Sequence, residues 1–243
     1  MKIIDAYWEK RNLGVDCKEI VIEDTDKVEV LSEIKSILES VAYLVVKVPT
    51  QRFDIYKELT SFGFAYIESS INFRIKVKEA VLLPLQHRLN QVVSYAEMDS
   101  NDRKQLFAEL DKGLFDTDRI ALDTNFSGKQ AATRYKNWIT DDLSRGTQLY
   151  KITYKDDVIG FFTFKEIGAG IYYPFLAGLY EKYNTSGLGF SIIRKPTEEA
   201  IKRGGNVIST YVSSNNMSVV RTHLQQGFII QDIKNVFVKH NNN

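Results

Sequence analysis

Two closely spaced glycines are the first candidate for chemistry in the sequence. Gly187 and Gly189 follow an apolar run, 171–179, that is typical of a strand, and they precede a helix-like segment that ends at Gly204-Gly205. A strand, a glycine turn and a helix start in that order leave several backbone N–H groups without a partner. Because glycine has no side chain, a phosphate can approach those groups closely. The loop therefore indicates an anion site, although two glycines alone do not specify the anion.

The other residues that could carry chemistry suggest no competing site. The histidines, His87, His223 and His240, and the single Cys17 stand at no spacing typical of a metal site. The sequence contains neither Gly-x-Ser-x-Gly nor a P-loop. It also lacks the third glycine of a dinucleotide-binding fingerprint. We therefore expect no metal, no serine hydrolase and no Rossmann-type dinucleotide site.

The elements that must position the glycine loop can be predicted from the surrounding pattern. Strands are expected over 149–154, 158–166 and 171–179, joined by turns at 155–157 and 167–170. After the loop we expect a helix, a strand over 207–212, a helix over 216–226 and a strand over 228–239. Pro196 should kink or split the first of these helices near Lys195, because proline removes a backbone donor.

This order of elements and two motifs resemble the GNAT (GCN5-related N-acetyltransferase) superfamily. The phosphate loop of that family, Arg/Gln-x-x-Gly-x-Gly/Ala, is similar to the residues from Asn184 to Gly189. A second motif, an asparagine followed eleven residues later by Gly-Phe, is matched by Asn216 and Gly227-Phe228. The resemblance implies an α/β (α+β) fold whose mixed, mostly antiparallel sheet is flanked by helices. It also implies acyl-CoA, either acetyl-CoA or another short acyl-CoA, as the co-substrate, without a metal.

The resemblance further assigns roles to individual positions. Backbone N–H groups of the loop would hold the CoA pyrophosphate, and Asn216 would bind the pantetheine arm. The backbone N–H of Leu179 would stabilise the oxyanion that forms on the thioester carbonyl. The implied cofactor-binding residues are Ala177, Leu179, Asn184, Thr185, Ser186, Gly187, Leu188, Gly189, Phe190 and Asn216.

Two positions depart from the family pattern. Asn184 is shorter than the usual arginine or glutamine and is neutral, so the grip on phosphate must rest more on the backbone. His223 replaces the tyrosine that protonates the departing thiolate. A histidine can donate a proton, so His223 is the candidate catalytic acid, and the alternative is a residue that only packs near the sulfur.

A looser resemblance concerns the acceptor. The stretches 114–123 and 134–139 are similar to those in sugar-nucleotide N-acyltransferases of the dTDP-fucosamine acetyltransferase type. This implies transfer of acetyl, or of a larger group such as 3-hydroxybutyryl, to a dTDP-linked amino sugar for surface polysaccharide synthesis. Arginine forks suit a diphosphate and an aromatic face suits a thymine. The candidate substrate-binding residues are Tyr172, Tyr173, Arg119, Arg134 and Arg221.

Neighbouring strand residues cannot both face one cleft. Tyr172 and Tyr173 must point to opposite sides of their strand, so at most one lines the acceptor site. Trp138 lies one helical turn after Arg134, where core packing is the expected role. Possible general bases are Glu68, Glu166 and Glu181, although the sequence favours a solvated carboxylate at each of these positions.

The first half of the chain also alternates helix and strand signals. Strands are expected over 18–23, 42–48 and 62–76, the last bent or paired with itself, and 85–95 favours a strand. Helices are expected over 24–40, with an N-cap among residues 24–26, and over 50–61 and 101–112. A helix over 129–140 precedes the strands of the second half.

A weak internal repeat connects the halves. A strand ending at Val48 is followed fifteen residues later by Gly63-Phe64, and a strand ending at Val212 is followed fifteen residues later by Gly227-Phe228. This spacing predicts a degenerate half-repeat in which only the second copy has the glycine loop, although such spacings also arise by coincidence. We expect an N-terminal α/β domain over 1–113 and the acyltransferase domain over 114–243.

Composition limits the partners and the compartment. Thirty-two basic residues against thirty-one acidic ones give no general attraction to nucleic acid. One cysteine, no apolar leader and no long uncharged apolar run predict a cytoplasmic protein without a membrane span. A homodimer is left open as well. Two alternatives stay open: a tandem-GNAT aminoacyltransferase that uses charged tRNA, and a non-catalytic module that senses CoA or a nucleotide.

Overall fold

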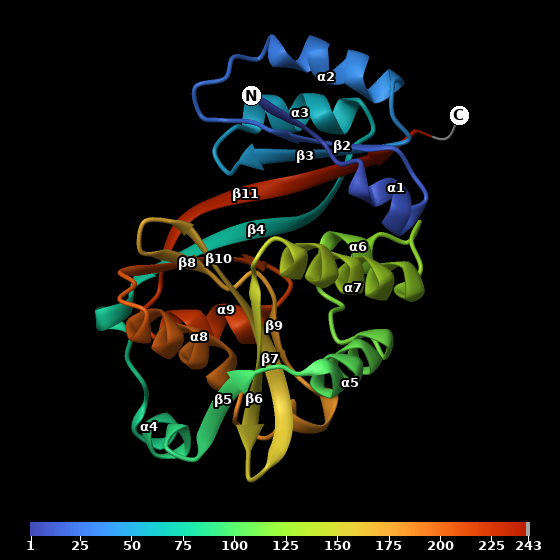
Figure 1. Cartoon of the computed structure of the whole chain (residues 1–243). Coiled ribbons are helices and arrows are strands. Elements are labelled where there is room, and N and C mark those ends of the chain that lie inside the picture. The colour runs from blue at the N-terminus through green and yellow to red at the C-terminus, as the bar shows by residue number, and fades with distance from the viewer. Residues whose placement is uncertain (242–243) are drawn as a thin grey trace.

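A computed structural model describes residues 1–241, and it contains one continuous mixed sheet with helices on both faces (Figure 1). The strand order is β1-β2-β3-β11-β4-β10-β8-β7-β6-β5, and β9 pairs with β7 beside this path. The strands are β1 Lys2–Asp5, β2 Cys17–Val21, β3 Tyr43–Pro49, β4 Ala65–Lys76, β5 Val93–Glu97, β6 Gln148–Tyr154, β7 Asp157–Gly168, β8 Ile171–Tyr173, β9 Ala177–Leu179, β10 Val207–Ser213 and β11 Ile229–His240. The predicted fold class is confirmed.

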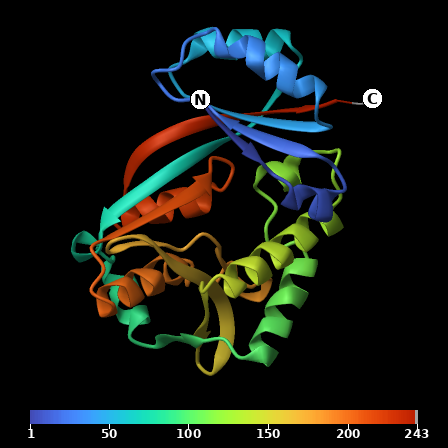
Figure 2. The same ribbon diagram turned by 45° about the horizontal axis from the view of Figure 1, so that its top comes forward.

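Helices cover each part of the sheet from both sides. They are α1 Trp8–Leu13, α2 Val30–Glu39, α3 Phe53–Ser61, α4 Pro84–Asn90, α5 Ser100–Asp111, α6 Arg119–Leu122, α7 Gly128–Ser144, α8 Ser191–Lys202 and α9 Met217–Gln225. Leu44 and Val46 pack under α2 and α3, whereas Tyr43 and Val45 face α1, α6 and α7. This division follows from the alternation of side chains along β3. Figure 2 shows α1 beside α7 on the face opposite to α2 and α3.

The internal repeat is present in the structure. The unit β3-α3-β4 recurs as β10-α9-β11, and β4 and β11 are both 12 residues long, starting at residues 65 and 229, an offset of 164. The register follows the same offset, because Val48 pairs with Asn235 and Val212 pairs with Ile71. The last strand of each half therefore lies between strands of the other half. Ser70 and Lys234, which this offset makes equivalent, pair with each other and mark the pseudo-twofold axis.

Only the C-terminal half opens a gap in the sheet. In the N-terminal half β2 pairs with β3 from Cys17 to Val21, whereas β8 pairs with β10 at only two positions, Ile171/Val207 and Tyr172/Ile208. Beyond them β9 pairs with β7 alone. The single strand predicted over 171–179 is therefore two strands, separated by residues 174–176. The splayed strands leave a cleft between β9 and β10.

The loop before α2 differs from the loop before α8 in its chemistry. Residues 22–29 contain three acidic residues and a lysine between Ile22 and Val28 and no glycine. The amino group of Met1 donates to the Asp26 carboxylate at 2.5 Å. An acidic loop without glycine repels an anion, so the N-terminal copy has no counterpart of the glycine loop. This fits the predicted half-repeat.

Several local predictions were wrong. The segment 85–95 is helix α4 followed by β5, because Pro84 stands at the first helical position and the Gln86 side chain accepts the Leu83 N–H at 3.1 Å. Strand β4 pairs with β10 and β11 rather than with itself. Helix α8 continues through Pro196 without splitting. Helix α2 begins at Val30, after residues 24–26, and no side chain caps it.

The sheet does not divide at residue 113. Strand β5, which precedes that position, pairs with β6, and α5 packs with α7 in the core that also contains Leu149 and Phe161. We use N-terminal half for β1 to β4 and C-terminal half for β5 to β11. Strand β4 of the N-terminal half and β11 of the C-terminal half contact each other more extensively than any other two elements of the described residues.

Candidate active site

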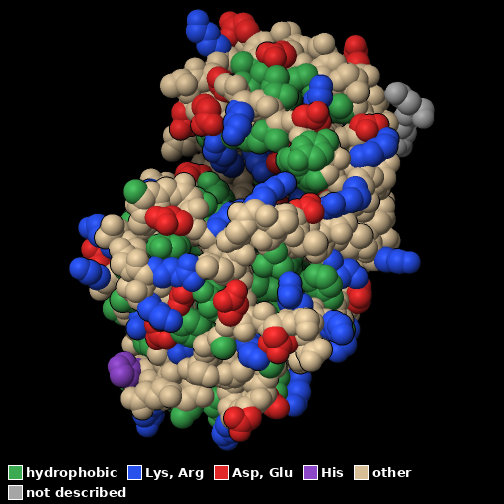
Figure 3. All heavy atoms as spheres, viewed as in Figure 1, with side chains coloured by type: hydrophobic (Ala, Val, Ile, Leu, Met, Phe, Trp, Pro, Cys, Tyr) green, Lys and Arg blue, Asp and Glu red, His purple; other side chains and the backbone are tan. Residues whose placement is uncertain are grey.

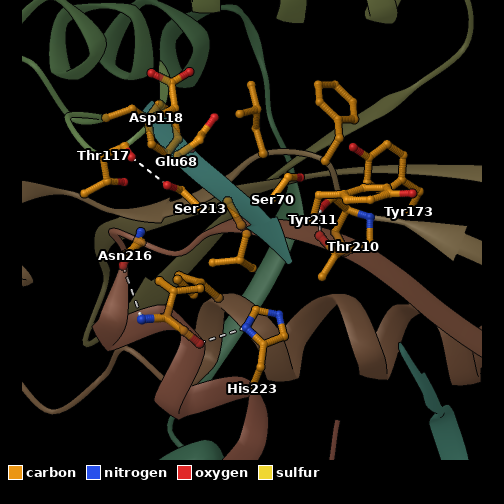
Figure 4. Close-up of a pocket in the computed structure, with 18 of the residues that line it drawn as sticks. Glu68, Ser70, Thr117, Asp118, Tyr173, Thr210, Tyr211, Ser213, Asn216 and His223 are labelled. Carbon is orange, nitrogen blue, oxygen red and sulfur yellow. Dashed lines mark hydrogen bonds between the residues drawn. The ribbon is translucent and has the colours of Figure 1, made fainter. Parts of the chain in front are cut away.

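A cavity of 260 Å³ runs through the gap between β9 and β10. At one end it is lined by Ile192 and Ile193 of α8 and by His223 of α9. At the other end it reaches Glu68 of β4 and Asp118, which precedes α6. Figure 4 shows Asn216 and His223 below the sheet, and Glu68, Thr117, Asp118 and Ser213 together above it. One passage thus connects the helix layer after the glycine loop with the opposite face of the sheet.

The glycine loop presents backbone donors to open space. Leu188 and Phe190 are buried in the core and anchor the loop, whereas Gly187 has φ 77° and is exposed. The N–H groups of Gly187, Gly189 and Phe190 donate no hydrogen bond to any described residue. Nothing lies within 4 Å of where a Cβ would stand on either glycine. Together with the N-terminus of α8, these donors can hold an anion.

The Ser186 side chain stabilises this loop conformation. Its hydroxyl donates to the Tyr183 carbonyl at 2.6 Å and accepts the Leu188 N–H at 3.2 Å. Asn184 and Thr185 are exposed at the outer edge of the loop. The predicted loop residues therefore lie together, and the unpaired backbone N–H groups at positions 187, 189 and 190 are the part of the loop that could hold an anion.

The edge of β9 that faces the gap carries free donors. Thr163 donates its N–H to Leu176 and Tyr180 donates to Ile159, both at 2.8 Å. Hydrogen-bonded and non-hydrogen-bonded positions alternate in an antiparallel pair, so Ala177 and Leu179 occupy the non-bonded positions toward β7. Their N–H groups therefore point away from β7 and into the gap. An extended amide chain could pair with this edge.

Asn216 lies where the gap opens toward α9. Its side-chain oxygen caps α9 by accepting the Val219 N–H at 3.2 Å, and the residue lines the cavity. The cap fixes the oxygen, so the amide NH₂ remains available as a donor. This placement is compatible with the contact to a pantetheine arm that the resemblance implies.

His223 is buried between aromatic rings. It stacks on Phe73 with 4.8 Å between centroids and packs edge-on against Phe228. Its Nδ1 lies 2.9 Å from the Val219 carbonyl, which can only accept, so Nδ1 carries the proton of the neutral ring and Nε2 carries none. Burial lowers the pKa of His223 to about 4. Near neutral pH the ring therefore has no proton to deliver from Nε2, which argues against the predicted acid role.

Two carboxylates meet at the other end of the cavity. Glu68 is 8% exposed, and its Oε1 accepts the Arg119 N–H at 3.3 Å. Burial, and secondarily the charge of Asp118, raise the pKa of Glu68. A buried carboxyl with a raised pKa suits proton abstraction from an amine. The sequence pattern named Glu68 only as one of three carboxylates, and it gave no signal for Asp118 or Ser213.

The other proposed bases do not line this cavity. Glu166 is exposed and accepts the Gly170 N–H at 2.7 Å, so it fixes a turn. Glu181 is exposed in the 3₁₀ turn 181–183 before the glycine loop. Of the three candidates, the fold brings Glu68 alone to the passage through the sheet.

The arginines predicted to grip a diphosphate are engaged by carboxylates. Arg119 is buried and donates to Glu19 at 2.6 Å and to Glu9 at 3.3 Å. Arg134 donates to Glu9 at 2.8 Å. Burial alone would raise the pKa of Glu19, but the charges of Arg119 and Lys47 lower it to about 2. This buried network joins the two halves, and it corrects the expectation that both arginines are free for substrate.

Of the remaining acceptor candidates, Tyr173 lines the cavity, whereas Arg221 and Tyr172 do not. Arg221 is exposed on α9 and does not line the cavity in the sheet gap. Tyr172 is buried and stacks on Phe164, whereas Tyr173 lines the cavity in the sheet gap. The alternation of side chains along the strand predicted that the two would differ. Trp138 stacks on Phe175 with 5.0 Å between ring centroids, which confirms its packing role, but it also lines the cavity.

A second cavity of 710 Å³ adjoins the first. It lies between the halves and is lined by α1, β2 and β3 on one side and by α7, β7 and β8 on the other. The two cavities share a wall that consists of Lys47, Ser70, Arg119, Arg134, Trp138, Tyr173 and Tyr211. A ligand could therefore extend from the gap in the sheet into the space between the halves.

Two further findings concern membranes and metals. Within residues 1–241, none of the helices combines the length and the apolar character needed to cross a membrane. In the same residues no three His, Cys, Asp or Glu side chains gather as a metal site would require.

No family model matches the sequence, and no curated protein matches it. The structure is similar to a GCN5-related N-acetyltransferase from Sphaerobacter thermophilus, with TM-score 0.61, 8% identity, and coverage of 92% of this chain and 73% of that one. It is similar to a tandem GNAT protein from the clavulanic acid biosynthesis pathway, with TM-score 0.56, 9% identity and coverage of 92% and 75%. It also resembles a glucosamine N-acetyltransferase region of a fungal multi-domain β-N-acetylglucosaminidase, with TM-score 0.62, 9% identity and coverage of 92% and 30%. These likenesses show the GNAT fold.

Proposed function

We propose that this protein is an acyl-CoA-dependent N-acyltransferase. One observation carries the proposal: a single passage through the sheet runs from α8, the helix that follows the glycine loop, past the unpaired edge of β9 to two carboxylates. A thioester with an extended amide arm and a pyrophosphate matches the first two features, and an amine matches the third. The shared GNAT fold is consistent with this reaction.

The backbone and Asn216 hold the acyl donor in this proposal. N–H groups of Gly187, Gly189 and Phe190 bind the pyrophosphate, and the β9 edge at Ala177 pairs with the pantetheine arm. In the proposed mechanism the N–H of Leu179, which points into the gap, stabilises the oxyanion on the thioester carbonyl. Such a donor is fixed before the reaction begins, so it costs no reorganisation.

Glu68 acts as the general base for the acceptor amine. The amine enters as an ammonium beside Glu68 and Asp118, and Glu68 takes the proton. The neutral nitrogen forms a bond to the thioester carbonyl carbon, and the C–S bond breaks. Because His223 has no proton to give, solvent protonates the thiolate. The amine's second proton leaves to solvent as the amide forms.

For the acceptor we propose a nucleotide-linked amino sugar, with acetyl or 3-hydroxybutyryl as the acyl group, for surface polysaccharide such as O-antigen. The second cavity supports this choice, because it offers cations and aromatic rings next to the carboxylate pair. Amino-sugar acceptors occur on this fold, as the glucosamine N-acetyltransferase region illustrates. A cytoplasmic location and a homodimer stay predictions, and gel filtration tests the second.

A thiol-release assay tests the reaction class. The full chain is supplied with acetyl-CoA or 3-hydroxybutyryl-CoA and a panel of dTDP- and UDP-linked 3-amino and 4-amino sugars. Release of one thiol per acylated sugar, identified by mass spectrometry, supports the proposal. Binding of CoA without turnover on any amine would favour the sensing module instead. Turnover only with charged tRNA would favour the aminoacyltransferase.

A further inference from the structure

The larger cavity lies on the axis that relates the two halves. Ser70 and Lys234 pair across β4 and β11 at that axis, and both line the cavity. Lys47 and Tyr211 are also related by the offset of 164 residues, and both line it too. The floor of the cavity is therefore built from equivalent strand positions of the two copies. The side chains at equivalent positions differ, so the floor of the cavity is chemically asymmetric although its backbone is related by the repeat.

The cavity has a positive excess of charge. Its lining includes seven lysines and arginines against three carboxylates, Glu19, Asp141 and Asp142. Glu19 is shared between Arg119 and Lys47, and Asp142 is shared between Lys165 and Arg145. Even when Glu9 and Glu23, which pair with cations of the lining, are included, the cations outnumber the carboxylates. Figure 3 shows lysine and arginine side chains around the hollow between the two parts of the molecule.

Two of these cations are accessible yet partly desolvated. The side chains of Lys47 and Lys234 are 31% and 22% exposed. Their ion pairs are with Glu19, which Arg119 also neutralises, and with Glu23, which is 55% exposed. An anion in the cavity could therefore contact both ammonium groups without stripping a buried carboxylate of its only partner. Partial burial strengthens such a contact compared with one at an open surface.

Aromatic side chains separate the positive cavity from the carboxylate pair. Tyr173 and Tyr211 pack edge-to-face with centroids 6.3 Å apart, and both belong to the shared wall. On the far side of this wall Glu68 and Asp118 carry negative charge. The connected space thus has two carboxylates at one end, a shared wall of cations and aromatic rings in the middle, and an excess of cations at the other end.

We infer that the larger cavity binds an anionic group of the acceptor, a phosphate or a carboxylate, while the acceptor amine lies at Glu68 and Asp118. The inference rests on the proposed function for the amine end. The opposite charges of the two ends fix the direction in which an acceptor enters. An amine without an anionic group lacks the second contact and binds more weakly.

Calorimetric titration of the full chain tests this site without requiring turnover. The probes are inorganic pyrophosphate and citrate, added in the presence of excess CoA so that the glycine loop is occupied. The test variant is Lys47→Gln/Lys234→Gln. In this variant Glu19 keeps its ion pair with Arg119, and Glu23 stays exposed to solvent. The matched control is Lys76→Gln, which removes an exposed β4 lysine outside both cavities. Circular dichroism establishes that each variant is folded.

We expect the double variant to bind pyrophosphate or citrate at least about tenfold more weakly than the parent, and Lys76→Gln to bind them with the parental affinity. Tighter binding of pyrophosphate assigns phosphorylated acceptors, and tighter binding of citrate assigns carboxylated ones. Equal affinity of the parent and the double variant, or no binding of either anion, overturns the inference. Failure of the proposed function is seen separately, as absence of CoA binding and thiol release, and it leaves the lysine-dependent anion titration intact.

Discussion

The carboxylate of Glu68, on the last strand of the N-terminal half, accepts the backbone N–H of Arg119 at the start of α6, 3.3 Å away. This contact places a residue of one repeat at the end of a passage that the other repeat opens. In the proposed mechanism, the half without a glycine loop supplies the base, and the half with the loop supplies the acyl-donor site. Neither half contains the proposed machinery alone.

Replacing Glu68 by glutamine should abolish most of the proposed activity. We expect Glu68→Gln to lower kcat by about 10²- to 10⁴-fold, the usual contribution of a general base. Because burial raises the Glu68 pKa, the parent should also lose activity as the pH falls through that raised value. Steady-state kinetics from pH 5 to 9 measure both effects. The control Glu166→Gln, at an exposed turn, should keep the parent profile, and a Glu68→Gln enzyme with parental kcat would remove Glu68 from the mechanism.

Replacing Gly187 should weaken the binding of acetyl-CoA for a reason other than backbone strain. Gly187→Val places a branched side chain at φ 77° in the space where a pyrophosphate would lie. We expect about a tenfold or larger rise in the KM for acetyl-CoA. The control is Gly204→Val, which has φ 74° and similarly open surroundings at the end of α8. Both variants should lose comparable thermal stability, so equal KM values in the two would contradict a phosphate-binding role for the loop.

His223 should make the fold sensitive to acid. Its pKa is about 4 in the folded protein and about 6.5 when unfolded, so the unfolded state binds more protons between these values. Stability should therefore fall as the pH drops from 6.5 to 4, by up to about 3 kcal/mol from this group. Urea unfolding at several pH values measures the slope, and His223→Leu should flatten it.

The same variant separates packing from catalysis. If His223 only fills space beside the passage, His223→Leu should leave kcat near the parental value at pH 8. A loss of about 100-fold in kcat with unchanged thermal stability would restore a chemical role for the ring. His223→Tyr, which introduces a hydroxyl, should raise kcat only if a proton donor at this position limits the rate.

Arg119 should be a stability residue. Arg119→Met leaves Glu9 and Glu19 buried without their shared partner, and breaking such a pair costs about 3–5 kcal/mol. Chemical denaturation at pH 7 measures the loss. Arg221→Met, at an exposed position of α9, should change stability by less than about 0.5 kcal/mol. Parental stability in Arg119→Met would show that the network does not hold the halves together.

The sequence predicted the elements around the glycine loop because their signals are local. Gly187 and Gly189 follow a strand and start a helix, and the Asn216 to Gly227 spacing spans one helix and its ends. The repeat was also visible, because Gly63-Phe64 and Gly227-Phe228 stand at matched distances from their strands. The break between β8 and β9 was missed, because residues 171–179 form one apolar run and the pairing with β7 and β10 decides where it divides.

The roles of the arginines and carboxylates depended on distant partners. Glu9 and Glu19 lie 110 and 100 residues from Arg119, so no local pattern shows that they neutralise it. Glu68 and Asp118 come together only because β4 is inserted beside β10. Segment 85–95 was misread because its apolar residues fit either period, and Pro84 at the helix start outweighed its strand-like composition.

The exchange of β4 and β11 also governs how the protein can be made. During synthesis β4 emerges long before residues 207–240, yet both of its neighbours in the sheet, β10 and β11, come from that last segment. Until residues 207–240 leave the ribosome, both edges of β4 are unpaired and the cavity beside Glu68 is not formed. We expect nascent chains to need protection from aggregation, and activity to arise in a single late step, never gradually with chain length.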